Sequence, residues 1–187
     1  VHVSLFDKNG KNAFLDNKDG CLLSPLARQF IAGVLKHSSE IILATNQTVN
    51  SYKRLVPGYE APVYKVWARR NRSTMIRIPQ VRTGMEKSTR MEFRAPDPAC
   101  NPYLAFAAIL AAGMKGIKGK YELPDPIEEN IFAMTEEERL AKGIEELPGT
   151  LKDAIEAAKE GTVLKEAFGE HIFKHLIKYK QAEWDEH

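Results

Sequence analysis

The sequence contains little cysteine, no long apolar run and none of the common catalytic signatures. Cys21 and Cys100 supply neither a disulfide framework nor metal-ligand spacing, so we expect a reducing, cytoplasmic compartment. The longest apolar stretch, residues 105–113, is much shorter than the ~20 residues that span a bilayer, and we expect no membrane segment. A signal peptide, a Walker-type glycine loop and a nucleophile–base pair are also missing. These absences argue against a secreted disulfide-rich module, a membrane protein and a P-loop enzyme.

Positive charge is concentrated in one segment of a nearly neutral chain. Residues 53–94 contain eight Arg and three Lys against three Glu, a local balance of +8, although the whole sequence sums to only +2. Residues 1–52 sum to +1 and residues 95–187 to −7. This asymmetry favours a site for a multiply charged anion over a generally basic surface that coats nucleic acid. An RNA-binding domain is the alternative, and it would show a steep salt dependence of binding.

The periodicity predicts short β-strands combined with several helices. Short β-prone runs predict strands within residues 1–6, 64–68, 73–78 and 90–95. Helical periods and caps predict helices at residues 25–37, 39–44, 103–118, 136–142, 151–160, 163–168 and 170–186. Small residues predict that helix 103–118 is buried and packs closely against the sheet, and proline and glycine predict a loop at residues 46–62. We divide one domain into residues 1–119 and an acidic helical region, residues 120–187.

The clearest local pattern is Arg90-Met-Glu-Phe-Arg94. Alternate residues of a strand share one face about 6.6 Å apart, which places Glu92 between two arginines and turns Met91 and Phe93 to the other side. Such a carboxylate would ligate a hard cation such as Mg²⁺ while the arginines hold phosphate oxygens. The alternative interpretation is an exposed ladder of charges that pair across strands.

Other candidate residues each have a functional and a structural interpretation. A second cluster of positive charge consists of Arg69, Arg70, Arg72 and Arg77. It is either a clamp for a small anion, a structural or interface surface, or an RNA surface. Glu60 lies in a loop between Pro57-Gly58 and Pro62, so it is either a gate that takes a proton over a reaction centre or an ordinary surface carboxylate. His2 and Ser4 share a strand face and either contact a nucleotide or serve a structural role.

Three blocks of sequence, in the family's order and with compatible spacing, closely resemble type I glutamine synthetase. They are Asn50-Ser-Tyr-Lys-Arg-Leu-Val-Pro-Gly-Tyr-Glu-Ala-Pro62, then Arg70-Asn-Arg-Ser with Arg77-Ile-Pro, then Arg90-Met-Glu-Phe-Arg-Ala-Pro-Asp-Pro-Ala-Cys-Asn-Pro-Tyr-Leu-Ala. The resemblance implies an α+β fold in which an antiparallel β-sheet, part of the family's catalytic barrel, is backed by helices and followed by a helical C-terminal region. It also implies an enzyme that joins ATP, glutamate and ammonia, through γ-glutamyl phosphate, to give glutamine, ADP and phosphate.

The resemblance also implies a role for each candidate residue. Arg54 would hold the carboxylate of glutamate, Arg94 would lie on the glutamate side, and Glu60 would sit on a closing flap and accept a proton from ammonium. Arg72 would contact the γ-phosphoryl group during transfer, and Glu92 would ligate Mg²⁺ or Mn²⁺. The remaining members of the ATP-binding set would be His2, Ser4, Arg77, Lys87 and Arg90.

Two rival interpretations accompany this one. A γ-glutamyl–amine ligase would keep the fold and change the acceptor, and a non-catalytic relative would serve as a binding or assembly module. For the full-length enzyme the resemblance implies a cytoplasmic homo-oligomer, a dodecamer, without a nucleic-acid partner. Phe132 stands where the adenylylated branch of the family carries a tyrosine, so we expect no control by adenylylation.

The family's other metal ligands precede His2, which leaves Glu92 as the one family metal ligand that this sequence contains. We therefore expect the sequence to be part of a longer enzyme and predict that the isolated 187-residue polypeptide forms no glutamine. A sensitive assay of glutamine formation on the purified polypeptide checks this prediction, and measurable turnover would contradict it.

Overall fold

The sheet is mixed rather than antiparallel throughout. The computed structural model describes residues 1–58 and 61–187. Its sheet has the order β1-β4-β3-β2, with β1 at His2–Val3, β2 at Tyr64–Ala68, β3 at Thr74–Arg77 and β4 at Met91–Phe93. The pairs β1–β4 and β3–β4 are antiparallel as predicted, but β2 and β3 are parallel. A parallel pair normally requires a crossover of about a dozen residues. Here residues 69–73 run back beside β2, so that Thr74 pairs with Tyr64.

The α+β prediction is confirmed by seven α-helices among the described residues. They are α1 (Pro25–Lys36), α2 (Ser38–Thr45), α3 (Val49–Lys53), α4 (Pro102–Lys118), α5 (Glu136–Ala141), α6 (Leu151–Glu160) and α7 (Val163–Asp185). Helix α7 is broken at Gly169, whose φ of 73° separates the two helical parts that were predicted. None of these helices, within the described residues, has both the length and the apolar character to cross a bilayer.

Helix caps explain where most of these helices begin. Ser24 accepts a hydrogen bond from the N–H of Ala27, and Asn101 accepts from Tyr103 and Leu104, as the cap-plus-proline pattern predicts. Helix α3 contradicts the predicted loop at residues 46–62. It begins with a capping box in which Thr48 and Ser51 each bond the other's backbone N–H. A serine in place of the usual Glu or Gln made this start hard to recognise.

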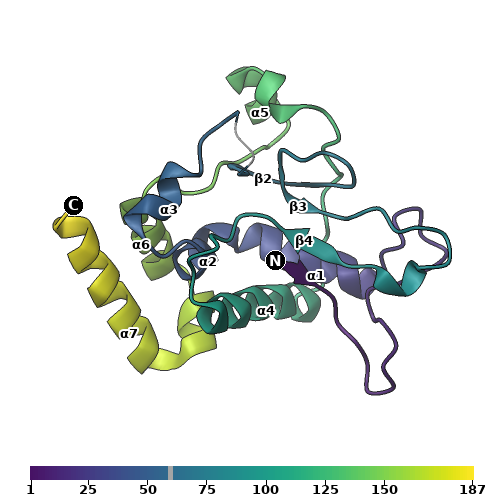
Figure 1. Ribbon diagram of the computed structural model, residues 1–187, viewed down its shortest axis with the longest axis horizontal. Coiled ribbons are helices and arrows are strands. Elements are labelled where there is room, and N and C mark those ends of the chain that lie inside the picture. The colour runs from purple at the N-terminus through teal and green to yellow at the C-terminus, as the bar shows by residue number, and fades with distance from the viewer. Residues whose placement is uncertain (59–60) are drawn as a thin grey trace.

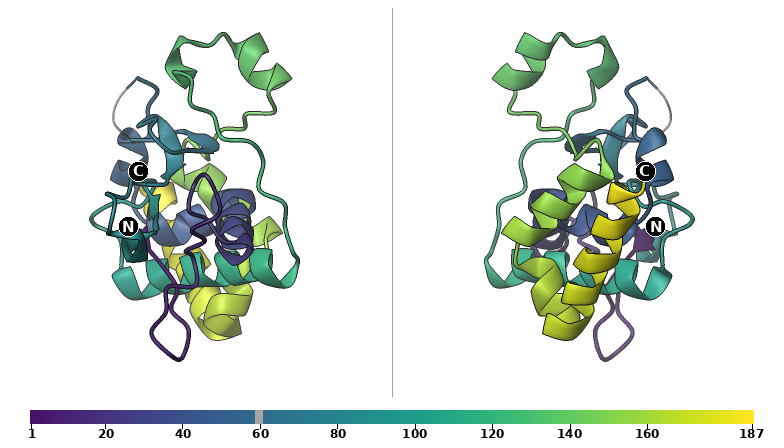
Figure 2. Two further views of the ribbon diagram at one scale, coloured as in Figure 1. Left: turned by 90° about the vertical axis from the view of Figure 1, so that its right-hand side faces the viewer. Right: turned by 90° about the vertical axis from the view of Figure 1, so that its left-hand side faces the viewer.

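Figure 1 shows the helices α1, α2 and α4 packed below the strands, whereas α5 projects at the top with the segments that flank it. The two side views of Figure 2 show the same separation. One hydrophobic core joins residues from both predicted regions, including Phe30, Ile42, Trp67, Ile155 and Leu164. The short 3-10 helices η1 (Glu86–Ser88) and η2 (Ile131–Ala133) lie in the connections. Helices α1, α2 and α4 thus support the sheet from one side.

Helix α4 packs closely against helix α1, not against the sheet as predicted. A Cβ atom added to Gly33 of α1 would lie 2.3 Å from the carbonyl oxygen of Ala112 and 2.8 Å from the Cα of Gly116. The small residues of α4 thus allow two helix backbones to approach. The helix is also only partly buried, because Tyr103, Phe106 and Leu110 are 83%, 55% and 48% exposed.

We predict that Gly33→Ala lowers the free energy of unfolding by about 1–3 kcal/mol, because the added methyl group forces the two helices apart. Urea denaturation of the variant and the wild type measures this difference. Gly20→Ala is the matched control, since a Cβ atom there meets nothing within 4 Å. Equal stability of the two variants would contradict the close helix contact.

Glu40 joins helix α2 to the start of α7. Its carboxylate accepts hydrogen bonds from the N–H groups of Thr162 (2.8 Å) and Val163 (3.1 Å) and also contacts the ring of His37. Burial raises the pKa of Glu40, but the bonds from His37, Val163 and Thr162 outweigh burial and hold the pKa below its ordinary 4.5. The ionised carboxylate therefore stabilises the folded state.

This pKa shift predicts a pH-dependent contribution to stability. In the unfolded chain Glu40 binds its proton at higher pH, so the contribution is complete above about pH 4.5 and is lost as the pH falls through the lower folded pKa. We predict that Glu40→Gln lowers the free energy of unfolding at pH 7 by about 1–3 kcal/mol and that the difference from wild type shrinks in acid. Urea titrations at pH 7 and pH 3 measure it. Glu156→Gln, which removes an exposed ion pair with Lys159, is the control and should change stability little at either pH.

Candidate active site

One face of the sheet carries a row of polar side chains across three strands. The register places His2 of β1 and Arg77 of β3 on either side of Glu92 in β4. The Nε of Arg77 donates to Oε2 of Glu92 at 2.5 Å. Met91 and Phe93 point to the other side and are fully buried, as the strand alternation predicts. The charge-ladder interpretation thus holds for Arg77 and Glu92, which pair across strands.

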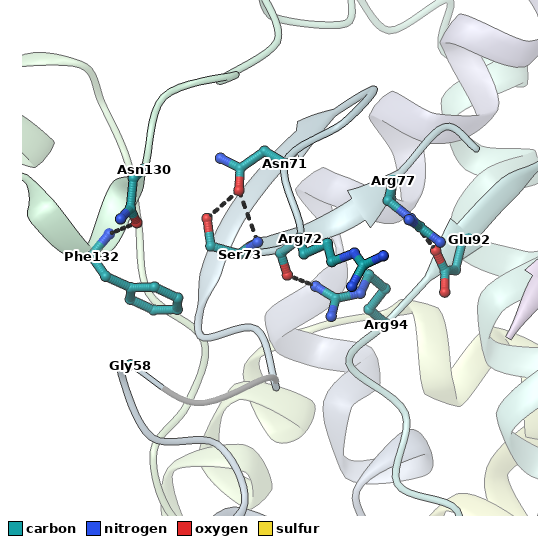
Figure 3. A pocket seen from close by; sticks show the side chains of 9 residues that line it. All are labelled: Gly58, Asn71, Arg72, Ser73, Arg77, Glu92, Arg94, Asn130 and Phe132. Atoms are coloured by element: carbon teal, nitrogen blue, oxygen red, sulfur yellow. Dashed lines mark hydrogen bonds and ion pairs between the residues drawn. The ribbon is translucent and has the colours of Figure 1, made fainter. Parts of the chain in front are cut away.

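A cavity of about 640 Å³ opens beside this pair (Figure 3). It is lined by Gly58, Asn71, Arg72, Ser73, Arg77, Glu92, Arg94, Asn130 and Phe132. The Nη1 of Arg94 donates to the carbonyl oxygens of Thr74 (3.1 Å) and Arg72. The exposed guanidinium of Arg72 has no hydrogen-bond or ion-pair partner among the described residues. We call this space the Arg72 cavity.

A second cavity adjoins the first and shares two residues with it. It has a volume of about 920 Å³ and is lined by Val1, Lys53, Arg54, Val56, Ala61, Glu92 and Arg94. Arg54 donates from Nη2 to the carbonyl oxygen of Ala95 at 2.5 Å. Its Nε is buried and has no partner within the described part of the chain. An unpaired buried donor is costly, and Arg54 also lines this cavity, so the residue is a candidate to bind an anionic ligand. We call this space the Arg54 cavity.

The predicted nucleotide-binding residues are not all brought together. Arg72 and Arg77 line the Arg72 cavity, whereas His2 and Ser4 line a third, mostly apolar cavity of about 360 Å³ beside α4. Arg90 lines neither cavity and lies beside His2, because its Nε donates to Nδ1 of His2 at 3.3 Å.

Burial lowers the pKa of His2, and the charge of Arg90 acts in the same direction while Glu92 opposes both. This favours the neutral imidazole, which accepts the hydrogen bond from Arg90.

Two predicted site residues stand apart from the cavities. Lys87 is exposed on η1 and lines none of the three, although its carbonyl oxygen accepts a hydrogen bond from Asn12 at 2.9 Å. Glu60, the predicted proton acceptor of the flap, lies outside the described residues. Its loop nevertheless reaches the site at Gly58, which lines the Arg72 cavity.

The described residues do not by themselves form a metal centre. Nowhere in residues 1–58 and 61–187 do three or more His, Cys, Asp or Glu side chains gather as a cation would require. Glu92 is a single carboxylate, and it is engaged by Arg77. A divalent cation needs several oxygen ligands, so Glu92 would be one contributor to a set completed elsewhere.

Sequence reasoning missed the wall of the Arg72 cavity opposite the arginines. Asn130 and Phe132 form part of it, and Asn71 and Ser73 hold the turn that carries Arg72. The Asn-x-Ser spacing of residues 71–73 is a signal for a side chain that bonds its own turn. Nothing in the linear pattern indicates that residues 127–132 lie beside this turn.

Comparisons with known proteins agree with this architecture. The family model described as the catalytic domain of glutamine synthetase matches residues 1–187. The glutamine synthetase of Thermotoga maritima is 54% identical over 186 residues, and that of Thermus thermophilus is 52% identical over 187. A solved structure described as "GmaS/ADP complex-Conformation 1" has a TM-score of 0.84 and 32% identity.

The matches extend along the whole chain but along less than half of the relatives. The alignments to both synthetases include 100% of this chain, which spans 42% and 41% of their lengths. The structural match covers 99% of this chain and 41% of the solved one. With a match to the family model along its full length and relatives above 50% identity, the chain belongs to the glutamine synthetase catalytic-domain family.

Proposed function

We propose that the complete protein containing this chain is a glutamine synthetase that amidates glutamate with ammonia at the expense of ATP. The observation that supports this most directly is the pair of adjoining cavities that share Glu92 and Arg94. A transfer of a phosphoryl group to a carboxylate requires two anions to meet at one point. Two cation-lined spaces with a common wall suit that requirement.

The proposed roles follow the two cavities. Arg54 and Arg94 would bind glutamate in the Arg54 cavity, while Arg72 and Arg77 would face the transferring phosphoryl group in the Arg72 cavity. Phosphoryl transfer depends mainly on positioned cations that stabilise spread negative charge. Glu60 would accept the proton of ammonium from the flap, and closure of the flap would protect γ-glutamyl phosphate from water.

The nucleotide and the metal belong to the same proposal. His2, Ser4, Lys87 and Arg90 would complete the ATP-binding set, and the related solved structure is described as an ADP complex. Glu92 would contribute one ligand to Mg²⁺ or Mn²⁺, with the other ligands supplied from outside the described residues.

We also propose that the complete protein is cytoplasmic and forms a homo-oligomer, a dodecamer by analogy with the family it resembles. Residues 1–119 would carry the half-site for nucleotide and glutamate. Residues 120–187 would form a helical region of the same domain, which agrees with the single hydrophobic core that spans both parts.

The test uses the complete protein and two arginines of the same turn. Arg72→Ala should lower kcat for glutamine formation by about 100-fold or more, because it removes a cation from the phosphoryl group in transfer. Arg70→Ala is the matched control. It removes the same charge from a position two residues earlier, and the side chain of Arg70 does not line the cavity. Its kcat should stay within about threefold of wild type.

Two results would count against the proposal. Wild-type protein that makes no glutamine from ATP, glutamate and ammonia would contradict the activity itself. In a competition assay, a preference for a primary alkylamine over ammonia as acceptor would instead favour the γ-glutamyl–amine ligase.

A further inference from the structure

Asn71 uses all of its side-chain hydrogen-bonding capacity to join two segments far apart in sequence. Its Nδ2 donates to the carbonyl oxygens of Ile127 (3.1 Å) and Glu129 (2.5 Å). Its Oδ1 accepts from both the N–H (2.9 Å) and the hydroxyl (2.5 Å) of Ser73. An amide offers two donors and two acceptors, so this side chain is fully satisfied.

The segment held by Asn71 forms the far wall of the Arg72 cavity. Asn130 and Phe132, which follow Glu129 directly, line the cavity opposite Arg72 and Arg94, as Figure 3 shows. Asn130 caps η2, because its side chain accepts a hydrogen bond from the N–H of Phe132 at 3.2 Å. The bonds of Asn71 therefore tie this wall to the turn that carries Arg72.

The same side chain also fixes the backbone on either side of Arg72. Asn71 precedes Arg72 and bonds Ser73, which follows it, so the turn is closed around the arginine. The carbonyl oxygen of Arg72 accepts from Arg94, which ties the turn to the strand that carries Glu92. Although its backbone is held at both ends, the guanidinium of Arg72 has no partner in the described structure. This combination leaves a free cation on a fixed support.

Glu128 makes a comparable connection that does not include Arg72. Its two carboxylate oxygens accept the N–H groups of Arg69 (2.8 Å) and Arg70 (3.2 Å). Glu128 thus joins this segment to the start of the turn with two hydrogen bonds. Asn71 also makes two hydrogen bonds to the segment, at residues 127 and 129. The difference is that, among the described residues, Glu128 makes no hydrogen bond to Ser73. The chain thus provides a matched pair for separating attachment of the segment from orientation of Arg72.

We infer that Asn71 is a positioning residue for the reaction, which closes the turn at residues 71–73 and so holds Arg72 in the geometry that phosphoryl transfer requires. The inference rests on the proposed function. A catalytic group displaced by about 1 Å can lose about 100-fold in rate, and an arginine on an unclosed turn would occupy many more orientations. Binding of glutamate, which we assign to the adjoining Arg54 cavity, should be nearly independent of Asn71.

The test compares Asn71→Ala, Asn71→Asp and Glu128→Ala in the complete protein. Asn71→Ala removes all four bonds, and Asn71→Asp keeps the acceptor for Ser73 but loses both donors to the segment. We expect kcat to fall about 10- to 100-fold in Asn71→Ala and by a smaller factor in Asn71→Asp, with the KM for glutamate within about twofold of wild type. Glu128→Ala should keep kcat within about threefold.

Hydrogen exchange supplies a second readout that does not depend on activity. Both Asn71→Ala and Glu128→Ala should speed amide exchange in residues 127–133, but only Asn71→Ala should speed it in residues 72–74. Glu128→Ala with the same loss of kcat as Asn71→Ala would overturn the inference, because attachment of the segment alone would then explain the effect. Wild-type kcat in Asn71→Ala would overturn it as well.

Failure of the proposed function gives a different result. If the wild-type complete protein forms no glutamine, the activity proposal falls, and exchange in residues 72–74 then decides the positioning role alone. Faster exchange there in Asn71→Ala and not in Glu128→Ala supports it, whereas equal exchange in the two variants overturns it.

The negative charge that Asn71→Asp introduces has its own control. If that charge lowers kcat, high salt should screen it and raise kcat toward the wild-type value, so kcat is measured at low and high salt.

Discussion

The alternation of side chains along β4 is the constraint on which the site depends. Met91 and Phe93 are buried in the core, and a strand that turns these two inward must turn its neighbours outward. Glu92 therefore stands on the open face, where Arg77 reaches it from the neighbouring strand. A slip of one residue in register would bury the carboxylate and expose the two apolar side chains. The core thus determines which charges reach the cavities.

The features that sequence reasoning predicted are those decided by neighbouring residues. The caps at Ser24 and Asn101 depend on bonds within one turn, and the faces of β4 depend on a period of two. The parallel pairing of β2 with β3 was not predictable in this way. A connection of five residues, such as residues 69–73, usually joins the two strands of an antiparallel hairpin. Here hydrogen bonds of Asn71 and Glu128, between segments more than fifty residues apart in sequence, hold the connection in a different path.

The candidate site shows the same difference between features set by neighbouring residues and features set by distant ones. Sequence reasoning found the arginines because their density is visible in a linear count, and it proposed roles for them only through the resemblance. It did not identify Asn130 or Phe132 as the opposite wall, because that wall exists only once the chain folds back on itself. Helix α4 shows the same limit. Its small residues correctly indicated close packing, but they do not specify whether the partner is a helix or a sheet.

The way in which the arginines are held bears on what they are able to bind. Arg54 and Arg90 donate to the backbone carbonyl oxygens of Ala95 and Ser88. A neutral carbonyl orients a guanidinium without cancelling its charge, whereas a carboxylate both orients and neutralises. Arg77 is the contrasting case, because Glu92 pairs with it directly. Cations oriented by carbonyls keep their attraction for an incoming anion, so such a site is pre-organised for charge that arrives with the substrate. Arg54 and Arg90 therefore contribute no ion-pair energy through these bonds to carbonyl oxygens, and each keeps its positive charge available to an anionic ligand.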